Sequence, residues 1–127
     1  MSGGKFATVI NCMDGRTQLP VIEWAKREYG VNYVDTITEP GPVRILAEGT
    51  DAAALASIRR RLGISVGKHG SSRVAIVAHA DCAGNAVDRQ TQLTQLRSAA
   101  ATALSWGMGV QVDLLWLGSD WQVERVG

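Results

Sequence analysis

Two short segments of the sequence combine thiol, imidazole and charged side chains. The first reads Cys12-Met13-Asp14-Gly15-Arg16, and the second reads His79-Ala80-Asp81-Cys82. Cysteine thiolate and histidine nitrogen are common ligands of zinc, and three protein ligands with an open fourth position are typical of catalytic zinc sites. His79 and Cys82 are three residues apart and can face one ion, to which Cys12 would add the third ligand. We therefore predict that Cys12, His79 and Cys82 bind Zn²⁺.

Two charged residues follow Cys12 closely. Asp14 is near enough to reach the fourth position of a metal ion bound by Cys12, or the water that occupies it. Arg16 can hold Asp14 by charge-assisted hydrogen bonds. We predict catalytic roles for Asp14 and Arg16, in a site that is closed if Asp14 itself binds the metal. The alternative is that Asp14 only caps the following helix, with Arg16 as its surface partner.

The elements that must position these segments alternate along the chain. Apolar and β-branched runs predict four strands, at residues 6–10, 31–37, 74–78 and 110–117. Apolar residues at helical spacing predict three helices, at about residues 18–29, 51–62 and 93–104. We expect Gly63 to end the second helix, with the three arginines of residues 59–61 in its last turn. Two prolines predict irregular backbone at residues 39–42, and residues 121–126 are expected to form an edge hairpin.

This order of strands and helices is typical of a parallel sheet with right-handed crossovers. We predict a three-layer α/β fold with a mainly parallel four-stranded sheet of order 2-1-3-4 and a C-terminal edge hairpin strand. Residues 1–127 would form one domain. In such sheets, ligands bind beyond the carboxyl ends of the strands, where the strand order reverses. The first and third strands would meet there, which would bring Cys12 and His79 together.

Composition excludes several other classes of function. The 13 basic and 12 acidic residues give a net charge of +1, so no global charge attracts nucleic acid or an anionic membrane. No apolar run approaches the roughly 20 residues of a spanning helix, and residues 1–5 lack the apolar core of a signal peptide. We expect a soluble, cytoplasmic protein that binds neither nucleic acid nor membranes. The two cysteines would be buried thiols or metal ligands there, rather than a disulfide or redox pair.

The two segments together resemble the paired signature of β-class carbonic anhydrases. The pattern is Cys12-x-Asp14-x-Arg16, followed much later by His79-x-x-Cys82. The resemblance covers most of the chain and is strongest to the short, carbonic-anhydrase-like members of that superfamily. It implies that the cysteines and histidine bind zinc and that the aspartate and arginine form a dyad beside the metal. The expected reaction is hydration of CO₂ to bicarbonate by a zinc-bound hydroxide, in a homodimer or higher homo-oligomer.

The sequence departs from that family's pattern at three places. Few residues precede the first expected strand, where the family has a helical arm that wraps the partner subunit. Residues 39–42 read Glu-Pro-Gly-Pro instead of an Arg-Asn-Ala-Gly type of loop, and Ala83 rather than glycine follows Cys82. Residues 39–42 and the pair Gly84-Asn85 could line a pocket or only shape turns. Two alternatives therefore stay open: a zinc hydrolase of carbonyl sulfide or carbon disulfide, or a catalytically silent metal-binding or regulatory module.

Overall fold

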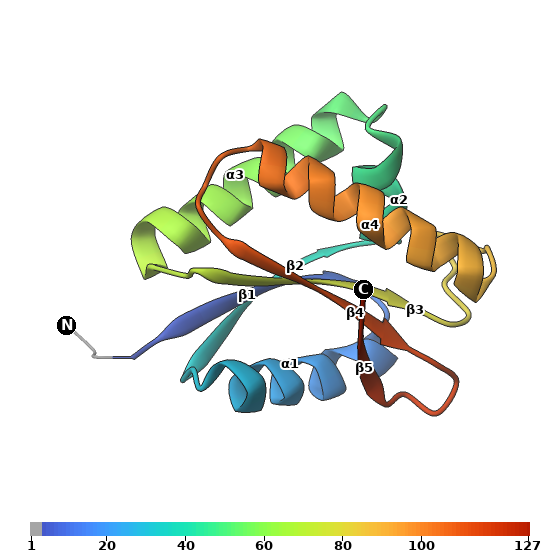
Figure 1. Ribbon diagram of the computed structural model, residues 1–127, viewed down its shortest axis with the longest axis horizontal. Coiled ribbons are helices and arrows are strands. Elements are labelled where there is room, and N and C mark those ends of the chain that lie inside the picture. Colours follow the sequence, from blue (N-terminus) through green and yellow to red (C-terminus); the bar gives the residue numbers. More distant parts are fainter. Residues whose placement is uncertain (1–3) are drawn as a thin grey trace.

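The computed structural model describes residues 4–127, which form a five-stranded sheet with helices on both faces (Figure 1). The elements are β1 (Phe6–Cys12), α1 (Gly15–Tyr29), β2 (Tyr33–Glu39), α2 (Pro42–Glu48), α3 (Ala52–His69), β3 (Arg73–His79), α4 (Arg89–Ser105), β4 (Gln111–Leu117) and β5 (Val123–Val126). Strands β1 to β4 are parallel in the order β2-β1-β3-β4, and β5 pairs antiparallel with β4. The predicted α/β fold and strand order are confirmed. Residues 1–3, part of the stretch in which we expect no signal peptide, lie outside the described residues.

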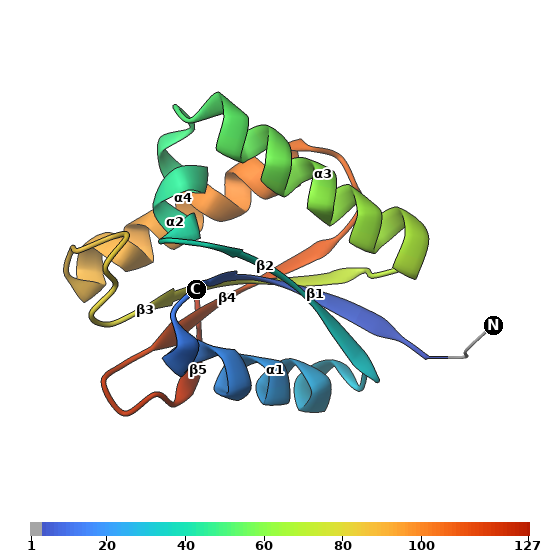
Figure 2. The same ribbon diagram turned by 180° about the vertical axis from the view of Figure 1, so that it is seen from behind.

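The helices divide into two layers around the sheet. Helices α2, α3 and α4 cover one face and α1 covers the other, as Figure 2 shows from behind. Successive residues of β1 point to opposite faces, so Ile10 is buried in the apolar cluster with Leu62 of α3, while Val9 is buried in the cluster with Val21 of α1. No helix within residues 4–127 combines the length and the apolar character needed to cross a membrane.

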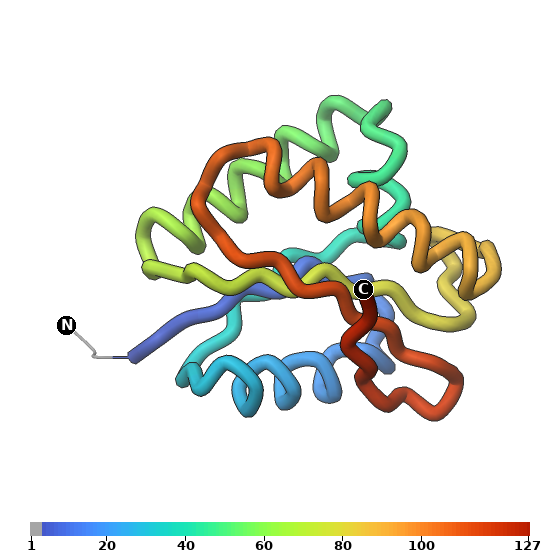
Figure 3. The backbone as a smooth tube through the Cα atoms, viewed as in Figure 1, coloured from blue at the N-terminus to red at the C-terminus, as the bar shows by residue number. Residues whose placement is uncertain are grey.

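Strands β1 and β3 separate before they end. They pair over only three positions, from Thr8–Val74 to Ile10–Ile76. Beyond that point β1 continues to Cys12 beside β2, and β3 continues to His79 beside β4. The loops that follow β1 and β3 lie at the same end of the sheet (Figure 3). The sheet therefore opens at the carboxyl ends of its two central strands, where the strand order reverses.

The expectation of irregular backbone at residues 39–42 is confirmed for residues 40 and 41 and was wrong for Glu39 and Pro42. Strand β2 extends to Glu39, and α2 begins at Pro42. Proline suits the first position of a helix, because its missing N–H would have no partner there and its fixed φ is helical. The second proline of this segment therefore starts a helix, α2, that the periodicity did not predict.

Helix α3 is longer than predicted. It continues through Gly63, which was expected to end it, and stops at His69. The cap is Gly70, whose φ is 71° and whose N–H bonds back to the carbonyls of Ser65 and Val66. The arginines of residues 59–61 consequently lie in the middle of α3 rather than in its last turn, so the predicted interaction with the helix dipole is wrong.

Residues 39–42 and the loop that carries Cys82 cross at two glycines. A Cβ atom on Gly84 would lie 2.5 Å from the carbonyl carbon of Pro40, and one on Gly41 would lie 2.8 Å from the carbonyl carbon of Gly84. Only glycine allows two backbones to approach this closely. The crossing thus ties the start of α2 to the segment beside β3.

We expect Gly84→Ala to lower the free energy of unfolding by about 1–3 kcal/mol, because the added methyl group forces the two backbones apart. Gly67→Ala is the matched control. Gly67 occupies an exposed position of α3, and a Cβ there meets nothing within 4 Å among the described residues. Alanine at this position should therefore raise the free energy of unfolding by about 0.5–1 kcal/mol. Urea unfolding followed by circular dichroism measures both changes. Wild-type stability in Gly84→Ala would contradict the close crossing.

Candidate metal centre

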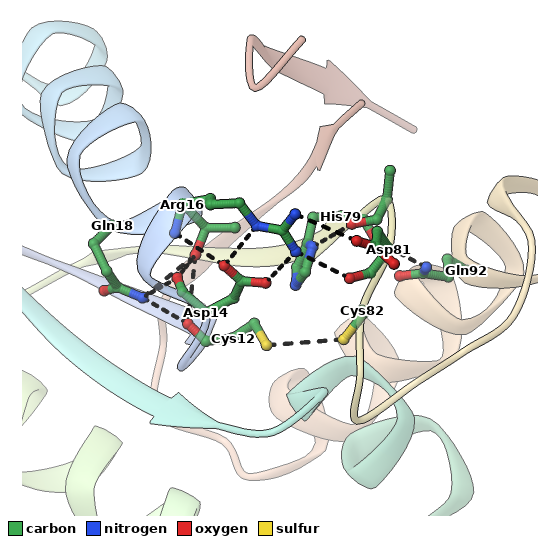
Figure 4. Close-up of polar contacts among 10 residues, drawn as sticks. Cys12, Asp14, Arg16, Gln18, His79, Asp81, Cys82 and Gln92 are labelled. Carbon is green, nitrogen blue, oxygen red and sulfur yellow. Dashed lines mark hydrogen bonds and ion pairs between the residues drawn. The ribbon is translucent and has the colours of Figure 1, made fainter. Parts of the chain in front are cut away.

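The two cysteines and His79 lie together in the gap between β1 and β3. Cys12 ends β1, His79 ends β3, and Cys82 lies three residues further along. The candidate ligand atoms all lie within 4.8 Å of one another, with the two sulfur atoms 3.8 Å apart (Figure 4). Each of the three residues is at most 5% exposed. The structure thus brings the three predicted ligands into one buried cluster.

His79 is oriented as a metal-binding histidine would be. Its Nδ1 lies 2.6 Å from the carbonyl oxygen of Ala80, and because a carbonyl only accepts, Nδ1 donates in this contact. The neutral imidazole then carries a lone pair on Nε2, which is buried and has no hydrogen-bond partner among the described residues. Metal-binding histidines commonly donate their other ring N–H to a carbonyl. Together with two thiols, this unpartnered nitrogen forms a donor set that fits zinc.

The two thiols differ in acidity. Burial raises the pKa of Cys12, but the charged imidazolium that His79 forms when protonated and the backbone N–H groups of Gly41 and Asp14 outweigh burial, and the net pKa falls to about 7. Burial and the neighbouring Cys12 raise the pKa of Cys82 to about 11. A cation between the sulfur atoms would favour the thiolate form of both.

Three side-chain amides hold the backbone where the β1–β3 ladder has ended. Asn11 Oδ1 accepts from the N–H of Cys12 at 2.8 Å, and Gln18 Nε2 donates to the Cys12 carbonyl at 2.7 Å. Gln92 Nε2 donates to the His79 carbonyl at 2.9 Å. Our sequence analysis did not single out these amides. The signal available was a polar residue in an otherwise apolar pattern. Asn11 directly follows the apolar run of residues 6–10 and is buried, and Gln92 lies on the buried face of α4.

Asp14 and Arg16 form an ion pair beside the cluster. The Arg16 backbone N–H and Nε donate to Asp14 Oδ1 at 2.9 and 3.1 Å, and Nη2 donates to Oδ2 at 2.7 Å. These bonds from Arg16 lower the pKa of Asp14 to about 2. Helix α1 therefore begins at Gly15, capped by Asp14, rather than near Gln18 as predicted. The structure thus contains both the helix cap and the ion pair, while the catalytic roles of Asp14 and Arg16 stay a prediction.

Asp81 contacts the same guanidinium from the loop after β3. Arg16 Nη1 lies 3.3 Å from Asp81 Oδ2, and Nη2 donates to the Asp81 carbonyl at 3.2 Å. These contacts join the segments that carry Cys12 and Cys82, although the Asp81 side chain itself is largely exposed to solvent.

The second histidine lies at the other end of the sheet. His69 is the last residue of α3, and its Nδ1 lies 2.6 Å from Asp35 Oδ2. Its ring stacks on Phe6, with the ring centroids 4.1 Å apart. These partners hold His69 away from the Cys12–His79–Cys82 cluster.

A pocket of about 210 Å³ adjoins the cluster. It is lined by Cys12, Met13, Asp14, Pro40, Ala83 and Gly84. Most of these side chains are apolar, and Asp14 supplies a carboxylate. Pro40 and Gly84 come from the two segments whose role the sequence left open, so both segments line the pocket.

Comparisons with known proteins agree with this architecture. The crystal structure of carbonic anhydrase from Streptococcus mutans aligns with a TM-score of 0.64 at 17% identity, over 95% of this chain and 81% of that one. β-Carbonic anhydrase isoform I from Trichomonas vaginalis aligns with a TM-score of 0.58 at 13% identity, over 93% and 80%. The β-carbonic anhydrase of Aspergillus fumigatus aligns with a TM-score of 0.51 at 14% identity, over 96% and 74%. At these identities the likeness shows the fold.

Family membership follows from a separate comparison. No curated protein matches the sequence. The family model described as "Putative carbonic anhydrase" matches residues 2–127, almost the whole chain. The chain therefore belongs to this family.

Proposed function

We propose that this protein is a zinc enzyme that hydrates CO₂ to bicarbonate. One observation carries the proposal: the buried Cys12–His79–Cys82 cluster, with the unpartnered Nε2 of His79, adjoins a small apolar pocket. Membership of a carbonic anhydrase family supports the same reaction. We further propose that residues 1–127 act as one domain of a homo-oligomer. We propose a cytoplasmic location, because unpaired cysteines used as metal ligands suit a reducing compartment.

Each residue of the site has a proposed role. Cys12, His79 and Cys82 would hold zinc, which when bound supplies Lewis-acid activation of water near neutral pH. The Asp14 carboxylate lines the pocket and has only acceptor oxygens, so it can orient the attacking water by accepting a hydrogen bond. Arg16 occupies one side of that carboxylate and keeps it from rotating.

The pocket favours a small, neutral and apolar substrate. Met13, Pro40 and Ala83 offer no side-chain hydrogen bond, and about 210 Å³ is ample for a small linear molecule. CO₂ meets these requirements. Carbonyl sulfide and carbon disulfide share the same shape and low polarity, so the apolar lining also favours hydrolysis of these molecules as the second candidate function.

We expect the protein to bind about one zinc ion, because residues 4–127 contain one three-ligand cluster. His79→Ala and Cys12→Ser should each lose most of the metal. His69→Ala is the matched control and should keep it, because His69 lies at the other end of the sheet. Metal analysis after dialysis, with competition by a chromophoric chelator, measures the content. Equal zinc binding by His79→Ala and His69→Ala would contradict the proposed ligand set.

For the zinc-loaded protein we expect CO₂ hydration that falls about a hundredfold in kcat/KM in Asp14→Asn, because the carboxylate that orients the attacking water is lost. Glu23→Gln, which changes an exposed carboxylate of α1, should leave kcat/KM unchanged. Stopped-flow assays with a pH indicator measure the rate, and the same preparations are tested with carbonyl sulfide and carbon disulfide. Full zinc content without CO₂ hydration would overturn the proposal. Turnover of the sulfur compounds would then indicate the second function, and no turnover a silent metal-binding module.

A further inference from the structure

Two strained residues meet at Arg16. Within residues 4–127, the residues other than glycine that have positive φ are Asp81, at 54°, and Trp121, at 58°. Left-handed backbone is unfavourable for residues with a Cβ atom, and such residues concentrate at functional sites. Both of them contact the Arg16 guanidinium.

The three partners of Arg16 approach from different directions. Asp14 and Asp81 accept hydrogen bonds from the edge of the guanidinium, and Figure 4 shows Arg16 between them. The Cζ atom of Arg16 lies over the indole ring of Trp121, 4.3 Å from the ring centroid. Trp121 lies in the turn between β4 and β5, so segments that follow β1, β3 and β4 meet at one side chain.

The degree of exposure decides which of these contacts can restrain Arg16. The Arg16 side chain is 47% exposed and that of Asp81 is 84% exposed, so their ion pair is weak and competes with water. The indole face removes water from one side of the guanidinium and limits its rotation. The ring centroid of Trp121 also lies 5.8 Å from that of His79. Trp121 therefore contacts the arginine of the dyad and lies beside a candidate metal ligand.

We propose that Trp121 is a positioning residue, whose indole holds the Arg16 guanidinium and thereby keeps the Asp14 carboxylate in place beside the metal ligands. The effect on turnover rests on the proposed function. The restraint on Arg16 is a property of the chain alone and can be measured without activity. The competing explanation is that Trp121 only packs against the apolar cluster between α1 and the sheet.

Side-chain NMR measures the restraint directly. The Arg16 Nε–H, which donates to Asp14, is observed in ¹H–¹⁵N spectra and assigned by its disappearance in Arg16→Lys. In Trp121→Leu, which keeps an apolar side chain but removes the ring, we expect this signal to shift and its order parameter to fall. Trp121→Phe should restore both. Trp121→Gly suits the positive φ and provides a second ringless variant if Trp121→Leu does not fold.

The rate of CO₂ hydration measures how the restraint on Arg16 affects turnover. At equal zinc content, kcat/KM for CO₂ should fall about tenfold in Trp121→Leu, since small displacements of a positioning group are costly, and Trp121→Phe should recover most of it. Trp106→Leu is the matched control, because half-buried Trp106 directly follows α4, at the opposite end of the sheet. An Arg16 signal as ordered in the ringless variants as in wild type overturns the inference, whatever the activity. Zinc-loaded wild type that is inactive while the ringless variants lose Arg16 order refutes the proposed function and supports the restraint.

Discussion

The separation of β1 and β3 after Ile10 and Ile76 is the constraint on which the site depends. Continued pairing would bring the two strands within hydrogen-bond distance and leave no space for three ligand side chains between them. Separation releases backbone groups that must find other partners, because unpaired buried amides and carbonyls are costly. Asn11, Gln18 and Gln92 supply those partners. The amides thus offset the loss of backbone hydrogen bonds in the gap and hold the backbone of two of the candidate ligands.

The same gap leaves polar side-chain atoms unsatisfied. The Nε2 of His79 has no partner among the described residues, and the two buried thiols lie close together with opposite pKa shifts. A dication would satisfy the nitrogen and favour both thiolates at once, so binding energy would also stabilise the fold. The crossing of Gly41 and Gly84 limits how far the loop of Cys82 can relax without it. The cluster is therefore held in a binding-competent arrangement by the backbone around it.

The apolar periodicity and the alternation of strands and helices along the chain were enough to predict the sheet and the end of it at which the candidate site lies. Alternating strands and helices are typical of a parallel sheet, which binds ligands at the carboxyl ends of its strands. The type and spacing of the candidate ligands, with the resemblance they carry, predicted which side chains to expect there, and the structure brings them together. The sequence predicted helix boundaries and backbone conformation less well. Pro42 begins α2, whose 7 residues are too few to show a clear apolar period, and Gly63 lies inside α3 despite its low helix propensity. Trp121 was expected in an edge strand, whereas it lies in a turn at positive φ, and no periodic pattern reports the sign of φ.

The Asp14–Arg16 pair illustrates how little of this site is explained by stability alone. An ion pair with a half-exposed arginine contributes at most about 1 kcal/mol, and a cap on α1 would need only the backbone N–H of Arg16. The additional bonds from Nε and Nη2, and the contacts to Asp81 and Trp121, leave the guanidinium few orientations. Ordering a long side chain costs entropy, and two residues at positive φ add to that cost. An ion pair that served only stability would not require this loss of entropy and this backbone strain. A carboxylate that must face the buried candidate ligands in one orientation would require both.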